Sequence, residues 1–303
     1  MGLFDLLPSS ASELYRNVRE LDNPRARAAR AECEILWREY EPLAVEPNFI
    51  AEFAKQTHER WFEMYLTVAL KRTGLPVVPG RRGRGPDVLL DFGDHRTWIE
   101  AIAPGSGDPM KPDSVPPPPV GEAFWVPFPL MALRVASALD TKAKQIKSYV
   151  TDGIVSETDV VVIAVNVHGI YNAWSDVDRL MRMALYGVEG VTVTFDLRDN
   201  SVHEIHPSMR DTIPKASGNV VRMQPFLDGS LPHISAALGS SVDLANHPDP
   251  LGRDFVVFPN VTSRIAWPDP LHLKVGHALV LEEFDGGWNT RMLSCDVRGD
   301  PSA

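Results

Sequence analysis

The sequence is poor in cysteine and lacks long apolar runs. Only two of its 303 residues are cysteines, Cys33 and Cys295, and they lie near opposite ends without partners at metal-ligand spacing. This scarcity argues against a disulfide framework and a zinc site, and it fits a reducing compartment. No apolar run approaches the ~18 residues that a membrane span needs. We therefore expect no contact with a membrane.

Positive charge is also in short supply. Thirty Lys and Arg residues against forty Asp and Glu residues give a net charge of −10 at pH 7. That balance weighs against a protein that binds nucleic acid through an overall positive field, but it allows a local basic groove. Residues 1–7 lack the basic leader and the length of a signal peptide. We therefore expect a cytoplasmic protein.

The hydrophobic pattern predicts alternating helices and strands. Helices are expected over 10–40, 49–73, 130–152 and 175–186, and strands over 87–92, 97–103, 160–166, 191–196, 254–258 and 277–284. The proline-bearing stretch 104–129 predicts a long surface loop. We divide the chain into an N-terminal helical segment (1–48), a core (49–200) and a C-terminal extension packed on the core (201–303).

A carboxylate lies in each of two consecutive apolar segments. Asp87 opens the segment 87–92, and Glu100 lies in the middle of the run WIEAI. Gly93-Asp94 suits a two-residue hairpin turn, because glycine readily supplies the positive φ that such turns need. Facing residues would then have numbers that sum to 187. This register places Asp87 opposite Glu100, with their Cβ atoms roughly 5 Å apart.

Two facing carboxylates are destabilising unless a cation lies between them. Oxygen ligands alone favour a hard divalent ion, Mg²⁺ or Mn²⁺. The alternative is a surface hairpin in which Asp87 and Glu100 both face water. These two residues alone do not decide between the two interpretations.

The helix expected over 49–73 carries acidic residues on its apolar side. At about 100° per residue, Glu59 and Glu63 fall beside the apolar stripe, whereas Arg60 and Lys71 point the other way. Glu63 lies within the run WFEMYL, which makes it the better candidate for a third carboxylate at the metal, directly or through water. Glu59 could instead pair with a nearby arginine.

The helix expected after the proline-bearing loop shows a similar pattern. Lys142, Gln145 and Tyr149 share its apolar face, while Lys144 and Lys147 point away. In one interpretation the helix is simply amphipathic and Lys142 extends out to solvent. In the other, Lys142 points inward, orients or deprotonates a water near the metal and stabilises developing negative charge.

The order of these segments resembles the PD-(D/E)XK nuclease superfamily. The matching segments are ERWFEMYL, GPDVLL, WIEAIAP and KAKQIKSYV, and the resemblance covers roughly residues 50–167. It implies an α/β protein with a restriction-endonuclease-like core, in which helices flank a mixed central sheet. Residues 1–48 would add a helical segment to this core, and residues 201–303 an α+β extension.

The resemblance also implies a set of metal ligands. In that superfamily the aspartate, the glutamate and the backbone carbonyl after the glutamate hold the metal, which implies Asp87, Glu100 and the carbonyl of Ala101 as ligands of Mg²⁺ or Mn²⁺. The helical glutamate, which often completes the shell, matches Glu63.

Two further features concern the helix after the loop. Gln145 and Tyr149 match a Gln-x-x-x-Tyr pair that lies near the site and the nucleic-acid strand in related exonucleases. The superfamily expects a lysine two residues after the glutamate, where this chain has Ile102. Some members relocate that lysine to another element, and Lys142 is the position that we expect to replace it.

The resemblance predicts a metal-dependent nuclease that hydrolyses phosphodiester bonds, with DNA as the expected partner. Arg81, Arg82 and Arg84 precede Asp87 and are candidates to hold the phosphate backbone, although an arginine-rich loop is also often merely solvated. The missing lysine and the acidic net charge favour an alternative, a catalytically inactive relative that binds nucleic acid or protein. The sequence leaves a homodimer open.

Overall fold

The computed structural model describes residues 1–44, 46–80, 85–199, 201–269, 272–284 and 287–294. Arg81, Arg82, Arg84 and Cys295, which the sequence analysis considers, lie outside these ranges. The first half contains helices α1 (Glu13–Glu20), α2 (Pro24–Tyr40), α3 (Phe49–Lys55), α4 (Thr57–Arg72) and α5 (Phe128–Thr151), and strands β1 (Val77–Val78), β2 (Val88–Asp91) and β3 (Arg96–Ile102). The second half contains strand β4 (Val160–Asn166), helix α6 (Val177–Tyr186), and strands β5 (Val188–Phe195), β6 (Val202–Met209), β7 (Thr212–Pro214), β8 (Val220–Arg222), β9 (Ala236–Ser240), β10 (Val256–Pro259), β11 (His277–Phe284) and β12 (Gly287–Ser294).

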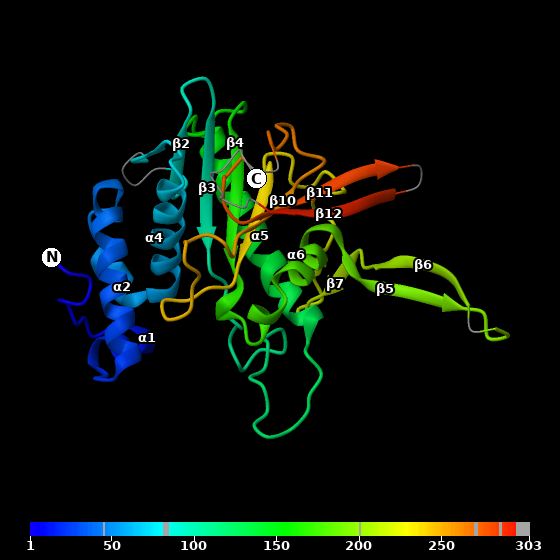
Figure 1. The fold of residues 1–303 in the computed structure, drawn as a ribbon, viewed down its shortest axis with the longest axis horizontal. Helices are drawn as coiled ribbons and strands as arrows, with labels where there is room; N and C mark the ends of the chain where they lie inside the picture. The colour runs from blue at the N-terminus through cyan, green and yellow to red at the C-terminus, as the bar shows by residue number, and fades with distance from the viewer. Residues whose placement is uncertain (45, 81–84, 200, 270–271, 285–286, 295–303) are drawn as a thin grey trace, which may run out of the picture.

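A mixed central sheet with helices on both faces forms the body of the protein (Figure 1). Its strand order is β1-β2-β3-β4-β9-β10-β11-β12. The pairs β3–β4, β4–β9 and β10–β11 are parallel, and the other neighbours are antiparallel. The prediction of an α/β protein with a mixed, helix-flanked sheet is therefore confirmed.

Two hydrophobic cores lie on the two faces of this sheet. One contains apolar residues of α1–α4 packed on side chains of β2, β3, β4 and β9. The other contains apolar residues of α5 and α6 packed on the opposite side chains of the same strands. Strand β4 (VVVIAVN) is buried along its whole length, as its continuous apolar pattern predicts for a strand that is covered on both faces.

The hairpin of β2 and β3 has the predicted register. Val88 pairs with Ile99 and Leu89 with Trp98, so the numbers of facing residues sum to 187 as expected. Gly93 has a φ of 90°, which the turn requires and glycine tolerates. The long segment between β3 and α5 contains no helix or strand, in agreement with the predicted surface loop.

Several helix boundaries differ from the prediction. The segment 10–40 is divided into α1 and α2, because Asn23 caps a new helix that begins at Pro24. The segment 49–73 is divided at Gln56, whose φ and ψ of −121° and 52° are not helical. Thr57 there shares a hydrogen bond with the side chain of Ser12. This tertiary contact is invisible to a helical periodicity.

A strand is present where one was predicted at 191–196, but it does not continue the α/β alternation of the core, so that part of the prediction was wrong. It forms β5, which pairs only with β6 in a separate two-stranded sheet among the described residues. Residues 191–195 are exposed on both faces. The alternation of valine and threonine in this segment favours a strand but does not say what covers it.

Strands from residues 201–303 complete the sheet that begins in 49–200. Strand β9 lies directly beside β4, and β10, β11 and β12 follow it outward. Within the described ranges, no helix is both long and apolar enough to cross a membrane.

Because β9 belongs to the same sheet as the strands of residues 49–200, we expect the chain to unfold in a single transition whose free energy depends on the packing of β9. Leu238 is fully buried between the neighbouring strands. We expect Leu238→Ala to lower the free energy of unfolding by about 3 kcal/mol, because it leaves a cavity in the core. Val120→Ala, at a side chain that is 99% exposed, is the control and should change it by less than about 0.5 kcal/mol. Urea denaturation followed by circular dichroism measures both. A second, separate transition in Leu238→Ala would contradict this expectation.

Candidate active site

The site lies where β3 extends beyond the first residue of β2. The ladder between the two strands ends at the pair Val88–Ile99, while residues 100–102 remain paired with β4 on the other side. The backbone N–H of Ala101 donates to Oδ2 of Asp87 at 2.7 Å. The carboxylate of Asp87 thus takes the place that a further residue of the ladder would occupy.

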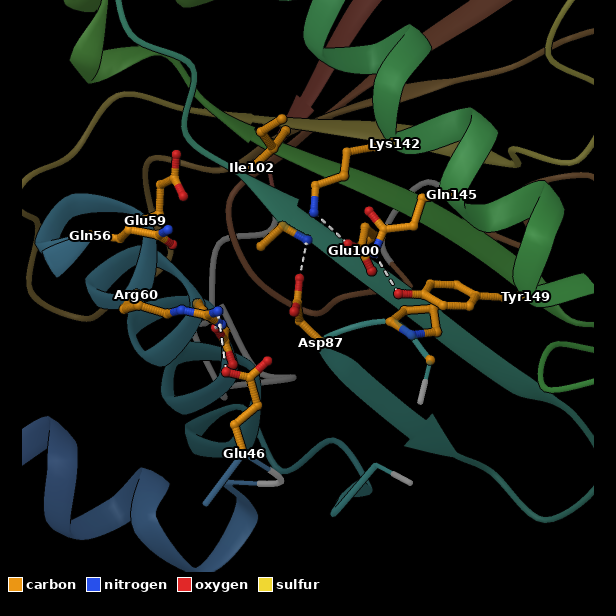
Figure 2. A pocket seen from close by; sticks show the side chains of 14 residues that line it. Glu46, Gln56, Glu59, Arg60, Asp87, Glu100, Ile102, Lys142, Gln145 and Tyr149 are labelled. Atoms are coloured by element: carbon orange, nitrogen blue, oxygen red, sulfur yellow. Dashed lines mark hydrogen bonds and ion pairs between the residues drawn. The ribbon is translucent and has the colours of Figure 1, made fainter. Parts of the chain in front are cut away.

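Asp87 and Glu100 lie on the same face of the sheet. Leu89 and Trp98 are directly paired, and both belong to the core beneath α5. Because side chains alternate along a strand, Asp87 and Glu100 share that face. Figure 2 shows both carboxylates directed into one pocket.

Glu100 is paired with Lys142 of α5. The distance from Nζ of Lys142 to Oε1 of Glu100 is 2.5 Å, and the two side chains are 19% and 2% exposed. Lys142 therefore points inward, whereas Lys144 is 75% exposed and pairs with Asp140. The other carboxylate oxygen of Glu100, Oε2, is buried and has no hydrogen-bond partner among the described residues.

Gln145 and Tyr149 follow Lys142 along the same face of α5. Nε2 of Gln145 donates to the hydroxyl of Tyr149, and both side chains line the pocket (Figure 2). Burial, followed by the negative charge of Glu100, raises the pKa of Tyr149. The tyrosine therefore remains a neutral hydroxyl at physiological pH.

Glu63 of α4 has partners for both carboxylate oxygens. The hydroxyl of Tyr40 donates to Oε1, and Nη1 of Arg60 lies 2.7 Å from Oε2. Arg60 also contacts Glu46, with 3.1 Å between Nη2 and Oε2. The prediction that Arg60 points away from the apolar side was wrong: its side chain is 19% exposed and lines the pocket.

These elements enclose a pocket of about 310 Å³. It is lined by Glu46, Gln56, Glu59, Arg60, Glu63, Gly85, Pro86, Asp87, Glu100, Ala101, Ile102, Lys142, Gln145 and Tyr149. The predicted residues of α4, β2, β3 and α5 are thus brought together, and Ile102 lies among them where the superfamily would have its lysine. The sequence pattern did not indicate that Tyr40, Glu46 and the inward-pointing Arg60 belong to the site. The spacing of Arg60 and Glu63, three residues apart on a helix, was a usable signal for an ion pair.

The carboxylates of the pocket disfavour one another's ionisation. Burial, and then the charge of Asp87, raises the pKa of Glu100 to about 8 and that of Glu63 to about 7. Burial likewise raises the pKa of Asp87, although the positive charge of Lys142 and the N–H of Ala101 oppose the rise. The positive charges in the pocket are therefore too few to keep all of its carboxyl groups ionised.

Lys142 keeps its proton in this setting. Burial lowers its pKa, but the charges of Glu100 and Asp87 outweigh that effect, and the pKa is raised overall. At neutral pH its amine is therefore a hydrogen-bond donor with a full positive charge. It is suited to stabilise an anion, and it is not suited to accept a proton.

The donor set fits a single hard divalent ion. Asp87, directly before β2, and Glu100 of β3 could supply oxygen ligands, and the unpartnered Oε2 of Glu100 is a buried acceptor that lacks a donor among the described residues. Among the described residues, no three His, Cys, Asp or Glu side chains form a preassembled metal-binding group. This agrees with the position of Glu63, whose oxygens are held by Tyr40 and Arg60. The backbone of Ala101 also lines the pocket.

Comparisons with known proteins give no relative: no family model, no curated protein and no solved structure matches the chain.

The bond from Tyr40 to Glu63 should contribute measurably to stability. Tyr40→Phe removes the donor to a buried carboxylate, so we expect the free energy of unfolding to fall by about 1–3 kcal/mol. Tyr171→Phe, at an exposed tyrosine, is the control and should be nearly neutral. Chemical denaturation of the two single variants and of the double variant Tyr40→Phe/Glu63→Leu measures the interaction free energy between the two side chains. An undiminished effect of Tyr40→Phe in the Glu63→Leu background would show that the hydroxyl does not act through Glu63.

Proposed function

We propose that the protein is a metal-dependent nuclease with a restriction-endonuclease-like core, acting on DNA. The observation that carries the proposal is the convergence of Asp87, Glu100 and Lys142, from two strands and a helix, on one pocket. The order of these elements agrees with the resemblance to the PD-(D/E)XK nucleases. Lys142 would substitute for the lysine that the superfamily has at the position of Ile102, because it reaches Glu100 from α5.

Asp87, Glu100 and the carbonyl of Ala101 would hold the Mg²⁺ or Mn²⁺ ion. When bound, such an ion polarises a phosphodiester and lowers the pKa of a coordinated water. The N–H of Ala101 holds Asp87 in position for this role. Glu63 would act through a water, since both of its oxygens already have partners.

The remaining residues would position the substrate. The protonated amine of Lys142 would orient the attacking water and stabilise the negative charge that develops on the phosphoryl oxygens. Gln145 and Tyr149 lie along the same helix face and would contact the strand beside the scissile bond. Arg81, Arg82 and Arg84 stay candidates for contacts to the phosphate backbone.

Cleavage should depend on Asp87 and Lys142. We expect the purified protein with Mg²⁺ or Mn²⁺ to cut DNA, and Asp87→Asn and Lys142→Met each to lower the rate at least about a hundredfold, since the first removes a charged ligand of the metal and the second removes the cation that stabilises the reacting phosphate. Lys144→Met is the matched control, because Lys144 lies on the same helix but in solvent. Gel assays on linear, circular, double-stranded and single-stranded DNA give the rates. Cleavage that survives Asp87→Asn would refute the site assignment.

Metal binding tests the ligand set separately from catalysis. We expect one Mn²⁺ site in the wild type and at least about tenfold weaker binding in Glu100→Gln, which loses a charged ligand. Glu52→Gln, at a surface residue of α3 that pairs with Lys55, should bind as the wild type does. Calorimetric titration measures the affinities. Equal affinity in Glu100→Gln would place the ion elsewhere.

The inactive relative is the second candidate. The ion pair of Glu100 with Lys142 and the saturation of Glu63 favour it, because both reduce the number of free oxygens in the pocket. A wild-type protein that binds DNA or a protein but cuts no substrate with either metal would support this reading against the nuclease.

A further inference from the structure

Strands β5 and β6 form an arm that leaves the body of the protein. In the described part of the chain, these two strands pair only with each other. Figure 1 shows the arm and the hairpin of β11 and β12 extending from the same side of the molecule. A two-stranded hairpin is marginally stable in water by itself. An arm of this length therefore gains from a surface that covers it.

One face of the arm is apolar. Val191 pairs with Pro207 and Phe195 with Val202, and paired residues lie on the same face. Val191, Val193 and Phe195 are 67%, 39% and 54% exposed. The other face of β5 carries threonines at 192 and 194. Beyond the strand, Leu197 near the tip is 91% exposed.

An apolar groove lies at the base of the same arm. Its volume is about 720 Å³, and Val191 and Pro207 form one wall. Tyr186 of α6, Leu227 and Leu281 of β11 contribute apolar surface from the body. Because Val191 and Pro207 belong to the apolar face, the groove and the exposed strip of the arm form one continuous surface.

The charge of the arm does not suit a nucleic acid or an anionic membrane. Residues 188–209 include four acidic residues, Glu189, Asp196, Asp199 and Glu204, against one arginine, Arg198. A phosphate-rich partner would be repelled by this balance. The partner that fits the apolar face of the arm is therefore a protein with an apolar surface.

We propose that the occupant is a second copy of this chain. In a pair related by a twofold axis, the distal residues of each arm, Val193, Phe195 and Leu197, lie in the groove at the base of the other copy's arm. Such an interface is self-complementary, because each chain supplies both a strip and a groove. The proposal does not depend on the nuclease activity.

The area is sufficient for a stable dimer. At their exposures, Val193, Phe195, Leu197 and Val202 present on the order of 450 Å² per arm. Two arms, together with the groove surfaces that they cover, would bury more than about 1,000 Å² in total, which is the size expected of a biological interface.

Sedimentation equilibrium tests the proposal on the full chain. We expect a dimer for the wild type and at least about hundredfold weaker dimerisation for Val193→Asp/Phe195→Asp, which places charge at the centre of the interface. Thr192→Asp/Thr194→Asp is the matched control, with the same added charge on the opposite face of the same strand, and should dimerise as the wild type does. Circular dichroism of each variant verifies that it is folded.

A crosslink tests the geometry. Chains with Leu197→Cys mixed with chains with Asn289→Cys, both carrying Cys295→Ser, should form a disulfide between copies on mild oxidation, since Asn289 lines the groove. A monomeric wild type, or a dimer that Val193→Asp/Phe195→Asp leaves intact, would overturn the proposal. Binding of single-stranded DNA or lipid vesicles to a monomer, abolished by the same substitutions, would overturn it in favour of that other partner.

Discussion

The early end of the β2–β3 ladder is the constraint on which the site depends. Because pairing stops at Val88 and Ile99, the N–H of Ala101 needs another acceptor, and Asp87 provides it. The same register directs Glu100 toward α5. Burial of an unpaired, ionised glutamate would cost several kcal/mol of folding free energy, so α5 must present a cation opposite Glu100. Lys142 does so, and the helical repeat then places Gln145 and Tyr149 one and two turns further along the pocket.

Much of this arrangement could be predicted from local patterns. A two-residue turn fixes the register of a hairpin, so the positions of Asp87 and Glu100 follow from Gly93 and the alternation of side chains. The inward orientation of Lys142 follows from helical periodicity. Arg60 was misassigned by the same method, because a helical wheel gives the direction of Cβ and ignores the reach of a long side chain. Its guanidinium returns to Glu63 on its own helix.

The second half of the fold could not be predicted in the same detail. The strands predicted at 254–258 and 277–284 are present as β10 and β11, but β9 is short and contains Gly239, so its pattern is weak. The place of β9 in the sheet depends on pairing with β4, a contact between residues far apart in the sequence, and β10 is placed by its pairing with β9. In β5 the pattern was read as a strand, but the chain itself leaves both of its faces exposed. A strand pattern reports which side chains could be covered, and only a tertiary or intermolecular contact decides whether they are.

In the proposed nuclease, a divalent ion would be important for binding the substrate as well as for chemistry. Five acids line the pocket, at positions 46, 59, 63, 87 and 100, against the two cations Arg60 and Lys142. Both cations are already paired with carboxylates. A nucleic-acid phosphate that entered the metal-free pocket would therefore find no unpaired cation to bind it, in a chain that is itself acidic. A bound divalent ion would supply a positive charge that neither side chain is free to give, so in the proposed nuclease metal binding should precede close contact with the scissile phosphate.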